Sequence, residues 1–399
     1  MGILSALSRL PRPTRAVTVL TAAALALAGC GGSSLNQSGG GQSGGDVKVG
    51  LLLPLSGVYA PLGQEMRAGF QLYLDQHGGK LGGRTIKVVT ADEGGGPQTG
   101  VPAGQKLVTQ DQATVVVGVV NSATALGLRD FFDESKKLLV IANAGADAIT
   151  GARKSDYIWR TSFSNGAVAA TLGPEVAKEV KGKVYLIAPD YAAGKEMVAG
   201  FRKSFEAAGG EVAGEKFTPF GTTQDFQPYL STIRGSGAKA VWSFYSGAEA
   251  VGFVKQYKEF GLAGKTPLYG PGFLTEGGVL DAQGRDAIKV KTSLHYSTEL
   301  DNPRNKEFVA AYRAKVGKPP TVFSVQAYDA AAVLDKALAK ASDTSAPELV
   351  KALNGIGPID SPRGQWSFGA DHNVRQQYYL REVKSSGGTF VNAITGELG

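Results

Sequence analysis

The segment VKVGLLLP, residues 47–54, predicts a short buried β-strand. Its apolar residues form one nearly continuous run that Pro54 ends, and such a run without alternation is typical of a strand covered on both faces. Residues 64–76 follow with an apolar face at helical spacing, and Gly78 ends the predicted helix. A buried strand followed by an amphipathic helix is the repeating unit of α/β folds with parallel sheets.

The same alternation continues in two series along the chain. The first series predicts strands at 85–90, 114–120 and 138–142 and helices at 103–110 and 125–135. The second predicts helices at 167–180, 193–208, 226–236 and 248–260 and strands at 183–188, 212–218 and 238–244. Beyond a strand from 290, we expect helices at 303–315, 323–341 and 347–353 and a hairpin-like pair at 364–368 and 377–383. The predicted fold is α/β, with two Rossmann-like lobes whose parallel sheets are flanked by helices.

The composition excludes several classes of function. The chain has 399 residues with one Cys, so no intrachain disulfide and no Cys-based zinc site can form. Its three His lie far apart at His77, His295 and His372, which argues against a metal site. The net charge is +7, but three arginines lie in residues 1–29 and no basic cluster stands out elsewhere. We therefore expect no nucleic-acid partner, since such binding needs a clustered basic surface.

The N-terminus has the pattern of an export signal. Arginines precede a mostly apolar stretch at 16–28, which is shorter than the ~20 residues of a transmembrane helix. The chain's only Cys follows in Leu27-Ala28-Gly29-Cys30, a sequence similar to a lipoprotein signal. We predict a signal peptide at 1–29, lipidation at Cys30 and a Gly/Ser tether at 30–45. An ordinary signal peptide with a chance Cys is the alternative.

The residues directly after each predicted strand are the candidates for a binding site, because ligands of open α/β sheets bind beyond the carboxyl ends of the strands. These loops are 54–60, 120–124, 142–146, 189–194, 245–247 and 270–275. They contain small, hydroxyl and aromatic residues but no paired carboxylates, Cys nucleophile or phosphate-cradling loop. Free amides at helix N-termini suit a carboxylate, and aromatic rings suit an apolar group. We therefore expect a binding protein and no catalytic, metal or cofactor site.

Several separate motifs carry a family resemblance over about 47–395. The motifs VGLLLPLSG (49–57), GPGFLTEG (270–277) and QAYDAAAVL (326–334) resemble, in order, the type I periplasmic binding proteins of the leucine/isoleucine/valine group, the solute receptors of ABC importers. Further motifs are similar to a subgroup associated with aromatic-acid uptake. They are NAGADAITG (143–151), RTSFSN (160–165), DYAAGKE (190–196), SFYSGAEAVGFV (243–254) and DSPRG (360–364).

The resemblance implies a domain organisation. Two lobes joined by three hinge crossings would hold the ligand in the cleft between them. We place the N-terminal lobe at 46–163 plus 293–368 and the C-terminal lobe at 164–292 plus 369–399. The family also implies no enzymatic activity, no cofactor, a monomer, and an ABC permease as partner.

The resemblance also implies the roles of particular residues. Ligand-carboxylate contacts fall on Ser122, Ala123, Thr124, Ala144 and Gly145, and the second lobe contributes Tyr191 and Tyr245. Other candidates in cleft loops are Tyr59, Leu62, Asn143 and Phe273. Each has a structural alternative: Ser122 as a helix N-cap, Asn143 as a brace of its own turn, and the aromatic residues as core. Arg363 fits a salt bridge better than an anion site, and His295 a structural role.

The segment Gly270-Pro271-Gly272-Phe273 departs from the amino-acid receptors of this family, which place Glu or Asp after Gly-Pro to pair the α-ammonium group of the ligand. Burying an ammonium without that partner is costly, and Phe273 adds an apolar wall instead. We therefore favour a carboxylate with an aromatic or apolar body, although Glu276 is close enough in sequence to substitute.

The predicted function is an exported, lipid-anchored solute receptor that captures a small carboxylate, preferably an aromatic acid, for an ABC permease. One alternative is a receptor for branched-chain amino acids or amides, which affinity for leucine but not benzoate would favour. A sensor ectodomain without transport is a second, and an enzyme a third that no catalytic constellation supports.

Overall fold

The computed structural model describes residues 46–398. The predicted signal peptide 1–29, the lipidation site Cys30 and the tether 30–45 lie outside the described residues.

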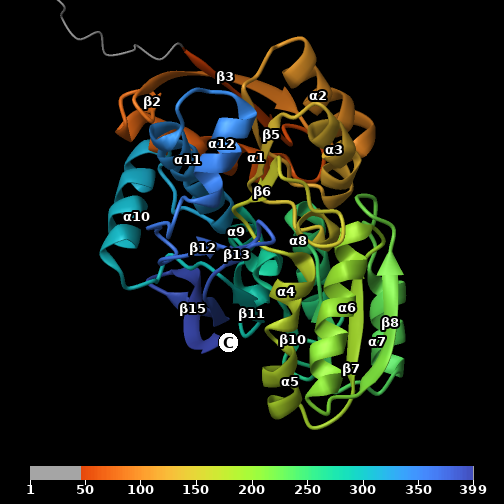
Figure 1. The fold of residues 1–399 in the computed structure, drawn as a ribbon. Coiled ribbons are helices and arrows are strands. Elements are labelled where there is room, and N and C mark those ends of the chain that lie inside the picture. The colour runs from red at the N-terminus through yellow and green to blue at the C-terminus, as the bar shows by residue number, and fades with distance from the viewer. Residues whose placement is uncertain (1–45, 399) are drawn as a thin grey trace, which may run out of the picture. The chain divides into compact units, whose positions relative to one another are not determined.

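The first sheet contains six strands in the order β2-β3-β1-β4-β5-β6 (Figure 1). Only the β2–β3 pair is antiparallel. Its strands are β1 (Val47–Leu53), β2 (Lys80–Leu81), β3 (Arg84–Asp92), β4 (Val115–Gly118), β5 (Leu138–Ile141) and β6 (Ile158–Arg160). The intervening helices are α1 (Ala60–Gln76), α2 (Pro97–Thr109), α3 (Ser122–Glu134) and the short 3₁₀ turn η1 (Asp147–Thr150).

The second sheet contains seven strands in the order β15-β14-β11-β10-β9-β7-β8. Strands β7 to β11 are parallel, and β14 and β15 extend the sheet in antiparallel fashion. They are β7 (Val184–Pro189), β8 (Val212–Thr218), β9 (Ala240–Ser243), β10 (Leu268–Pro271), β11 (Lys291–Leu294), β14 (Tyr378–Ser386) and β15 (Thr389–Leu398). The helices are α4 (Asn165–Ala170), α5 (Gly173–Glu179), α6 (Ala192–Ala207), α7 (Gln227–Gly235), α8 (Gly247–Glu259), α9 (Gly278–Gln283) and the turns η2 (Gly272–Thr275) and η3 (Gly284–Ala287).

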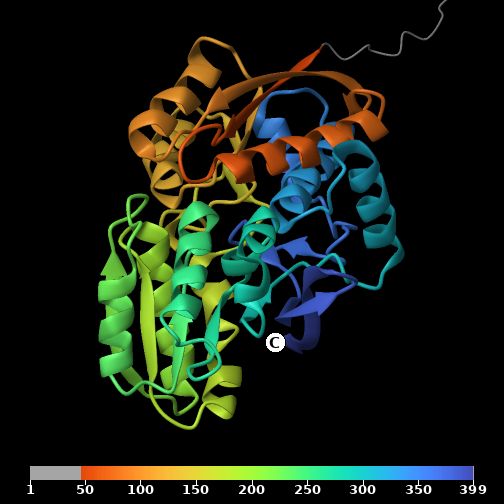
Figure 2. The ribbon, with the colours of Figure 1, turned by 180° about the vertical axis from the view of Figure 1, so that it is seen from behind.

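Three helices from the C-terminal part of the chain pack against the first sheet and its helix α1. They are α10 (Pro303–Val316), α11 (Val322–Lys340) and α12 (Ala346–Asn354). Figure 2 shows α10 and α11 beside the orange α1, and α12 packs against α11. The α1–α11 contact is very close, since a Cβ on Gly69 would lie 2.0 Å from the carbonyl oxygen of Ser324. We call the first sheet with α1–α3 and α10–α12 the first lobe, and the second sheet with α4–α9 the second lobe.

The chain passes between the two lobes three times. Residues 161–164 lead from β6 to α4, residues 295–302 lead from β11 to α10, and the segment after β13 (Val374–Arg375) leads into β14. The predicted fold class, two α/β lobes with parallel sheets and three crossings, is confirmed. The exact lobe boundaries stay a prediction.

Two predicted elements differ from the structure. The helix expected at 167–180 is split into α4 and α5, because Pro174 near the start of α5 has no N–H to continue a helix from the preceding turn. The hairpin expected between 364–368 and 377–383 is wrong: β12 (Ser367–Phe368) pairs with β13, and β14 pairs with β11 and β15. Gly387 and Gly388 both have positive φ and form the β14–β15 turn, a typical signal for a tight hairpin.

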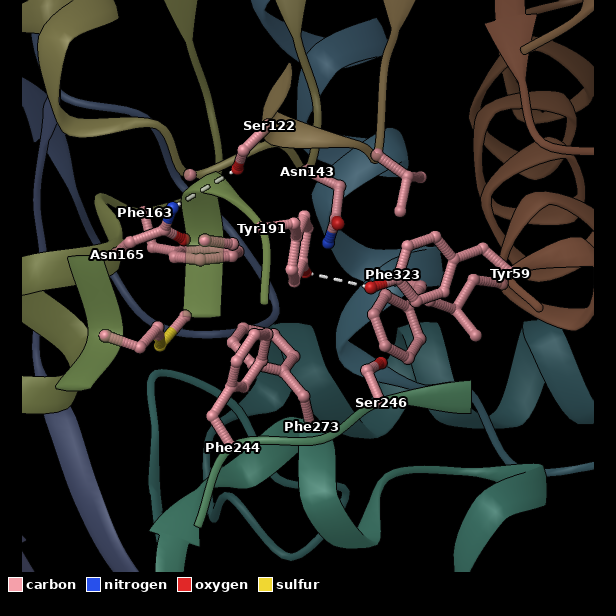
Figure 3. A pocket seen from close by; sticks show the side chains of 15 residues that line it. Tyr59, Ser122, Asn143, Phe163, Asn165, Tyr191, Phe244, Ser246, Phe273 and Phe323 are labelled. Carbon is pink, nitrogen blue, oxygen red and sulfur yellow. Dashed lines mark hydrogen bonds between the residues drawn. The ribbon is translucent and has the colours of Figure 1, made fainter. Parts of the chain in front are cut away.

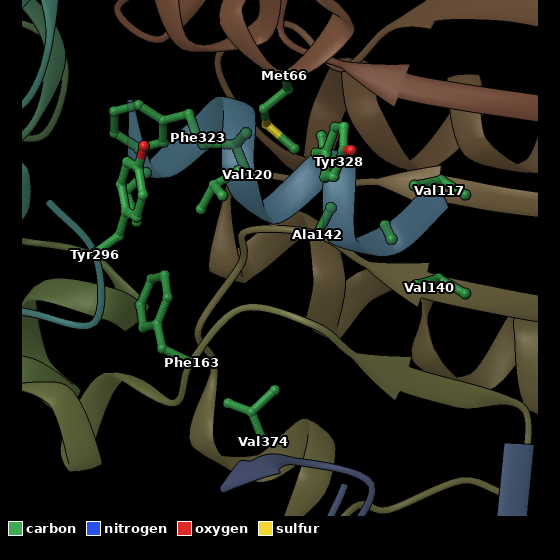
Figure 4. Close-up of a cluster of buried hydrophobic side chains, with 14 of the residues drawn as sticks. Met66, Val117, Val120, Val140, Ala142, Phe163, Tyr296, Phe323, Tyr328 and Val374 are labelled. Carbon is green, nitrogen blue, oxygen red and sulfur yellow. The ribbon is translucent and has the colours of Figure 1, made fainter. Parts of the chain in front are cut away.

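The largest hydrophobic core cluster reaches from the first sheet to the cleft (Figure 4). Met66 of α1, Val117 of β4 and Val140 of β5 are fully buried, and α11 contributes Phe323 and Tyr328 to the same cluster. Burying each such side chain stabilises the fold by about 1.5–3 kcal/mol. This packing supports the strands whose carboxyl ends carry the loops of the site.

Candidate ligand-binding site

A pocket lies where the carboxyl ends of β1, β4 and β5 face those of β7, β9 and β10 (Figure 3). Its lining residues are Tyr59, Leu62, Val120, Ser122, Asn143, Gly145, Phe163, Asn165, Tyr191, Ala193, Met197, Phe244, Ser246, Phe273 and Phe323. They bound about 310 Å³, and the side chains that project into this space leave room for little more than a water molecule. The rings therefore close most of this space, and a ring-sized ligand requires the lobes to separate or the side chains to turn.

Two tyrosines that line the pocket meet there from the two lobes. The hydroxyl oxygens of Tyr59 and Tyr191 lie 2.9 Å apart, and each residue precedes a helix, α1 in one lobe and α6 in the other. Glycines allow both helices to approach the end of the strand before them: a Cβ on Gly63 would lie 1.9 Å from the carbonyl oxygen of Pro54, and a Cβ on Gly194 would lie 1.9 Å from that of Pro189. In both lobes, a close contact between a helix glycine and the end of the preceding strand positions the tyrosine before that helix, and the two tyrosine hydroxyls meet between the lobes.

Aromatic rings form the walls of the pocket. The rings of Phe163 and Phe273 are 4.7 Å apart, and Phe273 also lies near Phe244 and Phe323, at 6.4 and 6.1 Å. Tyr191 stacks on Phe220 with ring centroids 4.2 Å apart. Packed rings at these distances favour an apolar, planar guest.

Polar groups of the first lobe gather at one end of the pocket, around the N-terminus of α3. Asn121 is the N-cap of α3, and its side-chain oxygen accepts hydrogen bonds from the N–H groups of Ala123 and Thr124. Glu93 is buried and accepts the N–H groups of Val120 and Asn121 at 2.7 and 2.8 Å, while burial raises its pKa to about 8. These hydrogen bonds from backbone N–H groups to Glu93 and Asn121 therefore hold the loop that carries Ser122 in place.

Asn165 at the start of α4 connects this loop to the second lobe. Its side-chain N–H₂ donates to Ser122 Oγ at 3.2 Å and to Glu196 Oε2 at 2.7 Å. Because Ser122 Oγ accepts this bond, its own hydrogen is available to a ligand. The backbone N–H of Gly145 is also available to a ligand, because it donates no hydrogen bond within residues 46–398. Ser122 and Gly145 thus offer two donors at the same end of the pocket.

The pocket carries no formal charge among the described side chains that line it. The carboxyl groups near the pocket are not among the side chains that line it. Burial raises the pKa of Glu196 above its ordinary value and that of Glu249 to about 7. Burial also raises the pKa values of Tyr59 and Tyr191, so both hydroxyls stay protonated at neutral pH. The site can hold an anion by neutral donors but has no lining carboxylate to pair a cation.

The structure brings most of the predicted site residues together. Those that line the pocket are Tyr59, Leu62, Ser122, Asn143, Gly145, Tyr191 and Phe273. The N–H groups of Ala123 and Thr124 are taken by Asn121, and that of Ala144 by the carbonyl of Val119. Asn121, and not Ser122, is the N-cap of α3.

Tyr245 does not reach the pocket. It is buried in a separate core cluster, with its hydroxyl 3.1 Å from Thr218 Oγ1. Phe244 lines the pocket in its place, because successive residues of an extended chain point to opposite faces. The sequence prediction also missed Val120, Phe163, Asn165, Ala193, Met197, Ser246 and Phe323. The motif RTSFSN contained two of them, directly after β6, as a signal that was present but not used.

Comparison with known proteins assigns the chain to a family. Residues 46–389 match the model of the periplasmic binding protein family. The chain belongs to the periplasmic binding protein family. A curated relative, the Leu/Ile/Val-binding protein homolog 6 of Brucella melitensis, is 33% identical over 354 residues, covering 87% of this chain and 90% of the relative.

Solved periplasmic binding proteins share the fold over nearly the whole described chain. A solute-binding protein of an ABC transporter from R. palustris, solved in complex with benzoate, is 38% identical, with a TM-score of 0.83 and coverage of 89% of this chain and 97% of that chain. Another from Rhodopseudomonas palustris BisB5, solved with 3,4-dihydroxybenzoic acid, is 30% identical, with a TM-score of 0.84 and coverage of 88% and 97%. The chain is thus a solute-binding protein of the ABC-transporter type, a class of receptors and not of enzymes.

Glu276 and Arg363, whose roles could not be decided from the sequence, each form an ion pair in this binding protein. Glu276 Oε2 pairs with Arg381 Nη1 at 3.0 Å, and its other oxygen accepts the N–H of Val322. Arg363 Nε pairs with Asp329 Oδ2 at 2.8 Å, and both side chains are buried. Neither Glu276 nor Arg363 lines the pocket, so Glu276 is not placed to pair a ligand ammonium there.

Among residues 46–398, no helix is long and apolar enough to cross a membrane. No group of three or more His, Cys, Asp or Glu side chains in that range is arranged to hold a metal ion.

Proposed function

We propose that this periplasmic binding protein captures a small aromatic carboxylate between its two lobes and delivers it to an ABC importer. The observation that carries the proposal is the division of the pocket into a donor end and an aromatic body. Hydroxyl and amide donors at Ser122 and Gly145 stand at one end, Phe163, Phe244 and Phe273 form the walls, and no carboxylate lines the pocket.

The chemistry of the pocket favours an acid over an amino acid. A carboxylate gains charge-assisted hydrogen bonds from neutral donors, and the aromatic body buries its faces against the rings. The ammonium of an amino acid would lose its water without gaining a counter-charge, at a cost of several kcal/mol. Relatives solved with benzoate and 3,4-dihydroxybenzoic acid support the same ligand class.

Binding is coupled to closure in this proposal. The ligand enters while the lobes are apart and is enclosed when Tyr59 of one lobe and Tyr191 of the other meet. The three crossings act as the hinge, and the closed form is the one that the permease receives.

The contact with Ser122 is tested by Ser122→Ala. Removing the hydroxyl takes one donor from the ligand carboxylate and one acceptor from Asn165, so we expect benzoate affinity to fall about 5- to 150-fold, equivalent to about 1–3 kcal/mol. Isothermal titration calorimetry measures this change. Ser135→Ala is the matched control, because Ser135 caps the opposite end of α3 and its hydroxyl has no partner among the described residues. Equal benzoate affinity in the two variants would remove Ser122 from the site.

We further propose that Cys30 carries a lipid anchor, with residues 30–45 as a flexible tether between membrane and receptor. Replacing Cys30 by Ser is expected to move the protein from the membrane fraction of the cell to the soluble extracytoplasmic fraction. A variant that stays with the membrane would contradict the anchor without affecting the proposed ligand.

A further inference from the structure

Glu196, on α6 of the second lobe, holds a side chain of the pocket without lining the pocket itself. Its Oε2 atom accepts a hydrogen bond from Asn165 Nδ2 at 2.7 Å and another from the backbone N–H of Asp147 at 3.1 Å. Asp147 begins η1 in the first lobe. One oxygen of Glu196 therefore connects α6 both to the opposite lobe and to the pocket residue Asn165.

The chemistry of these groups fixes the direction of the hydrogen bonds. The backbone N–H of Asp147 only donates, so Glu196 Oε2 accepts, and an ionised carboxylate has no hydrogen to donate. Asn165 must therefore face Glu196 with its N–H₂ group and not with its carbonyl oxygen. The other hydrogen of this N–H₂ group is donated to Ser122 Oγ at 3.2 Å (Figure 3). Both hydrogens of the amide then have acceptors, and the hydroxyl hydrogen of Ser122 is left for a ligand.

Glu196 lacks the counter-charge that the next acidic residue of the same helix has. Glu206 forms an ion pair with Arg202 on the surface of α6, whereas Glu196 forms none within residues 46–398. Burial raises the pKa of Glu196 above its ordinary value, and the nearby charge of Asp147 raises it further. Keeping a partly buried carboxylate without a cation costs free energy, which points to a role in holding the N–H donors around it.

The backbone of Asn165 is held in place without Glu196. Its N–H donates to the carbonyl oxygen of Gly145 at 2.7 Å, and the N–H of Gly166 donates to Asp147 Oδ1 at 2.9 Å. On the other side α6 packs closely, since a Cβ on Gly200 would lie 2.5 Å from the Gly166 carbonyl oxygen. The first turn of α4 is thus fixed by its own contacts, and Glu196 decides only how the side chain of Asn165 is oriented.

We propose that Glu196 is a positioning residue for the ligand carboxylate: it holds the Asn165 amide and so keeps the Ser122 hydroxyl as a donor to the ligand. The inference rests on the proposed function, because it needs a ligand that accepts this hydrogen bond. Without Glu196 the terminal torsion of Asn165 is free to turn, and its carbonyl oxygen then takes the Ser122 hydrogen. Since Glu196 also binds the N–H of Asp147, the donor end of the pocket is set when the two lobes come together.

Calorimetric titration of Glu196→Ala and Glu196→Gln with benzoate tests this role. We expect Glu196→Ala to lose at least about fivefold in affinity, the effect of one hydrogen bond. Removing a negative charge near an anion would by itself strengthen binding, so a loss reports the missing acceptor and not the missing charge. Glu196→Gln keeps an acceptor oxygen and is expected to restore most of the affinity. Glu206→Ala, on the same helix, is the control for removing an exposed carboxylate.

A double variant shows whether Glu196 acts through Ser122. We expect Glu196→Ala combined with Ser122→Ala to bind benzoate no more weakly than Ser122→Ala alone, because the hydroxyl that Glu196 prepares is already gone. Losses that add would overturn the positioning role. Circular dichroism of the free variants checks that each is folded, as the independent contacts of α4 predict.

Two further results would overturn the inference and leave the proposed function intact. One is benzoate affinity in Glu196→Ala equal to or above that of the wild-type protein. The other is a loss in Glu196→Gln as large as that in Glu196→Ala, since the acceptor oxygen would then not be what matters. If the wild-type protein binds neither benzoate nor 3,4-dihydroxybenzoate, the proposed function itself is contradicted, and the role of Glu196 with it.

Discussion

Replacing Arg363 by Ala is expected to lower the free energy of unfolding by about 3–5 kcal/mol, the cost of breaking a buried ion pair by removing one partner. Asp329 would remain in the core with its charge uncompensated, and burial already raises the pKa of that carboxyl above its ordinary value. Arg363 also donates to the carbonyl oxygens of Thr161 and Ser162 and to Gln376. It therefore connects α11 to two of the three crossings between the lobes.

Denaturant unfolding followed by circular dichroism measures this loss. Arg375→Ala is the control, because Arg375 forms an exposed ion pair with Asp371, and such pairs contribute only about 0–1 kcal/mol. A loss below 1 kcal/mol in Arg363→Ala would show that the Arg363–Asp329 pair does not hold the hinge region. The double variant Arg363→Met with Asp329→Leu is expected to recover much of the stability, since it leaves no buried charge.

Replacing Gly145 by Ala is expected to disturb the packing of the pocket and to weaken the binding of benzoate. The new Cβ would lie 2.1 Å from Asn165 Oδ1 and 2.5 Å from the ring of Phe163. Both side chains line the pocket, and Asn165 holds Ser122 and Glu196. Overpacking of this kind costs about 1–3 kcal/mol and an unsatisfied polar group a similar amount, so we expect benzoate affinity to fall at least tenfold.

Gly235→Ala is the matched control for the added methyl group, because Gly235 ends α7 and a Cβ there meets nothing within 4 Å. Calorimetry on both variants separates the local effect from a general one. Unchanged benzoate affinity in Gly145→Ala would mean that Asn165 and Phe163 move without consequence, and that the arrangement around Ser122 is not the binding site.

The α/β architecture could be predicted because each buried strand and each amphipathic helix has its own period in the sequence. Strand β8 at Val212–Thr218 lies where predicted. The C-terminal strands were harder, since β14 pairs with β11 from far along the chain and no local pattern specifies that partner. The Gly387-Gly388 turn was a local signal that the prediction did not use.

The candidate site could be predicted only in part. Loops that directly follow strands supplied Ser122, Asn143, Gly145 and Tyr191, because topology alone brings strand ends together. Phe323 was missed because its place depends on how α11 packs against the rest of the fold. The choice of Tyr245 over Phe244 failed because the strand ends one residue earlier than expected, and a shift of one residue reverses the face of the side chain.

Calorimetric titration of the purified protein with benzoate and, separately, with leucine decides between an aromatic acid and an amino acid as the ligand. We expect benzoate to bind at one site per chain and leucine not to bind, because the pocket has donors for a carboxylate and no carboxylate for an ammonium group. Binding of leucine without binding of benzoate would show that the protein is not an aromatic-acid receptor, and that a carboxyl group outside the described lining reaches the ligand.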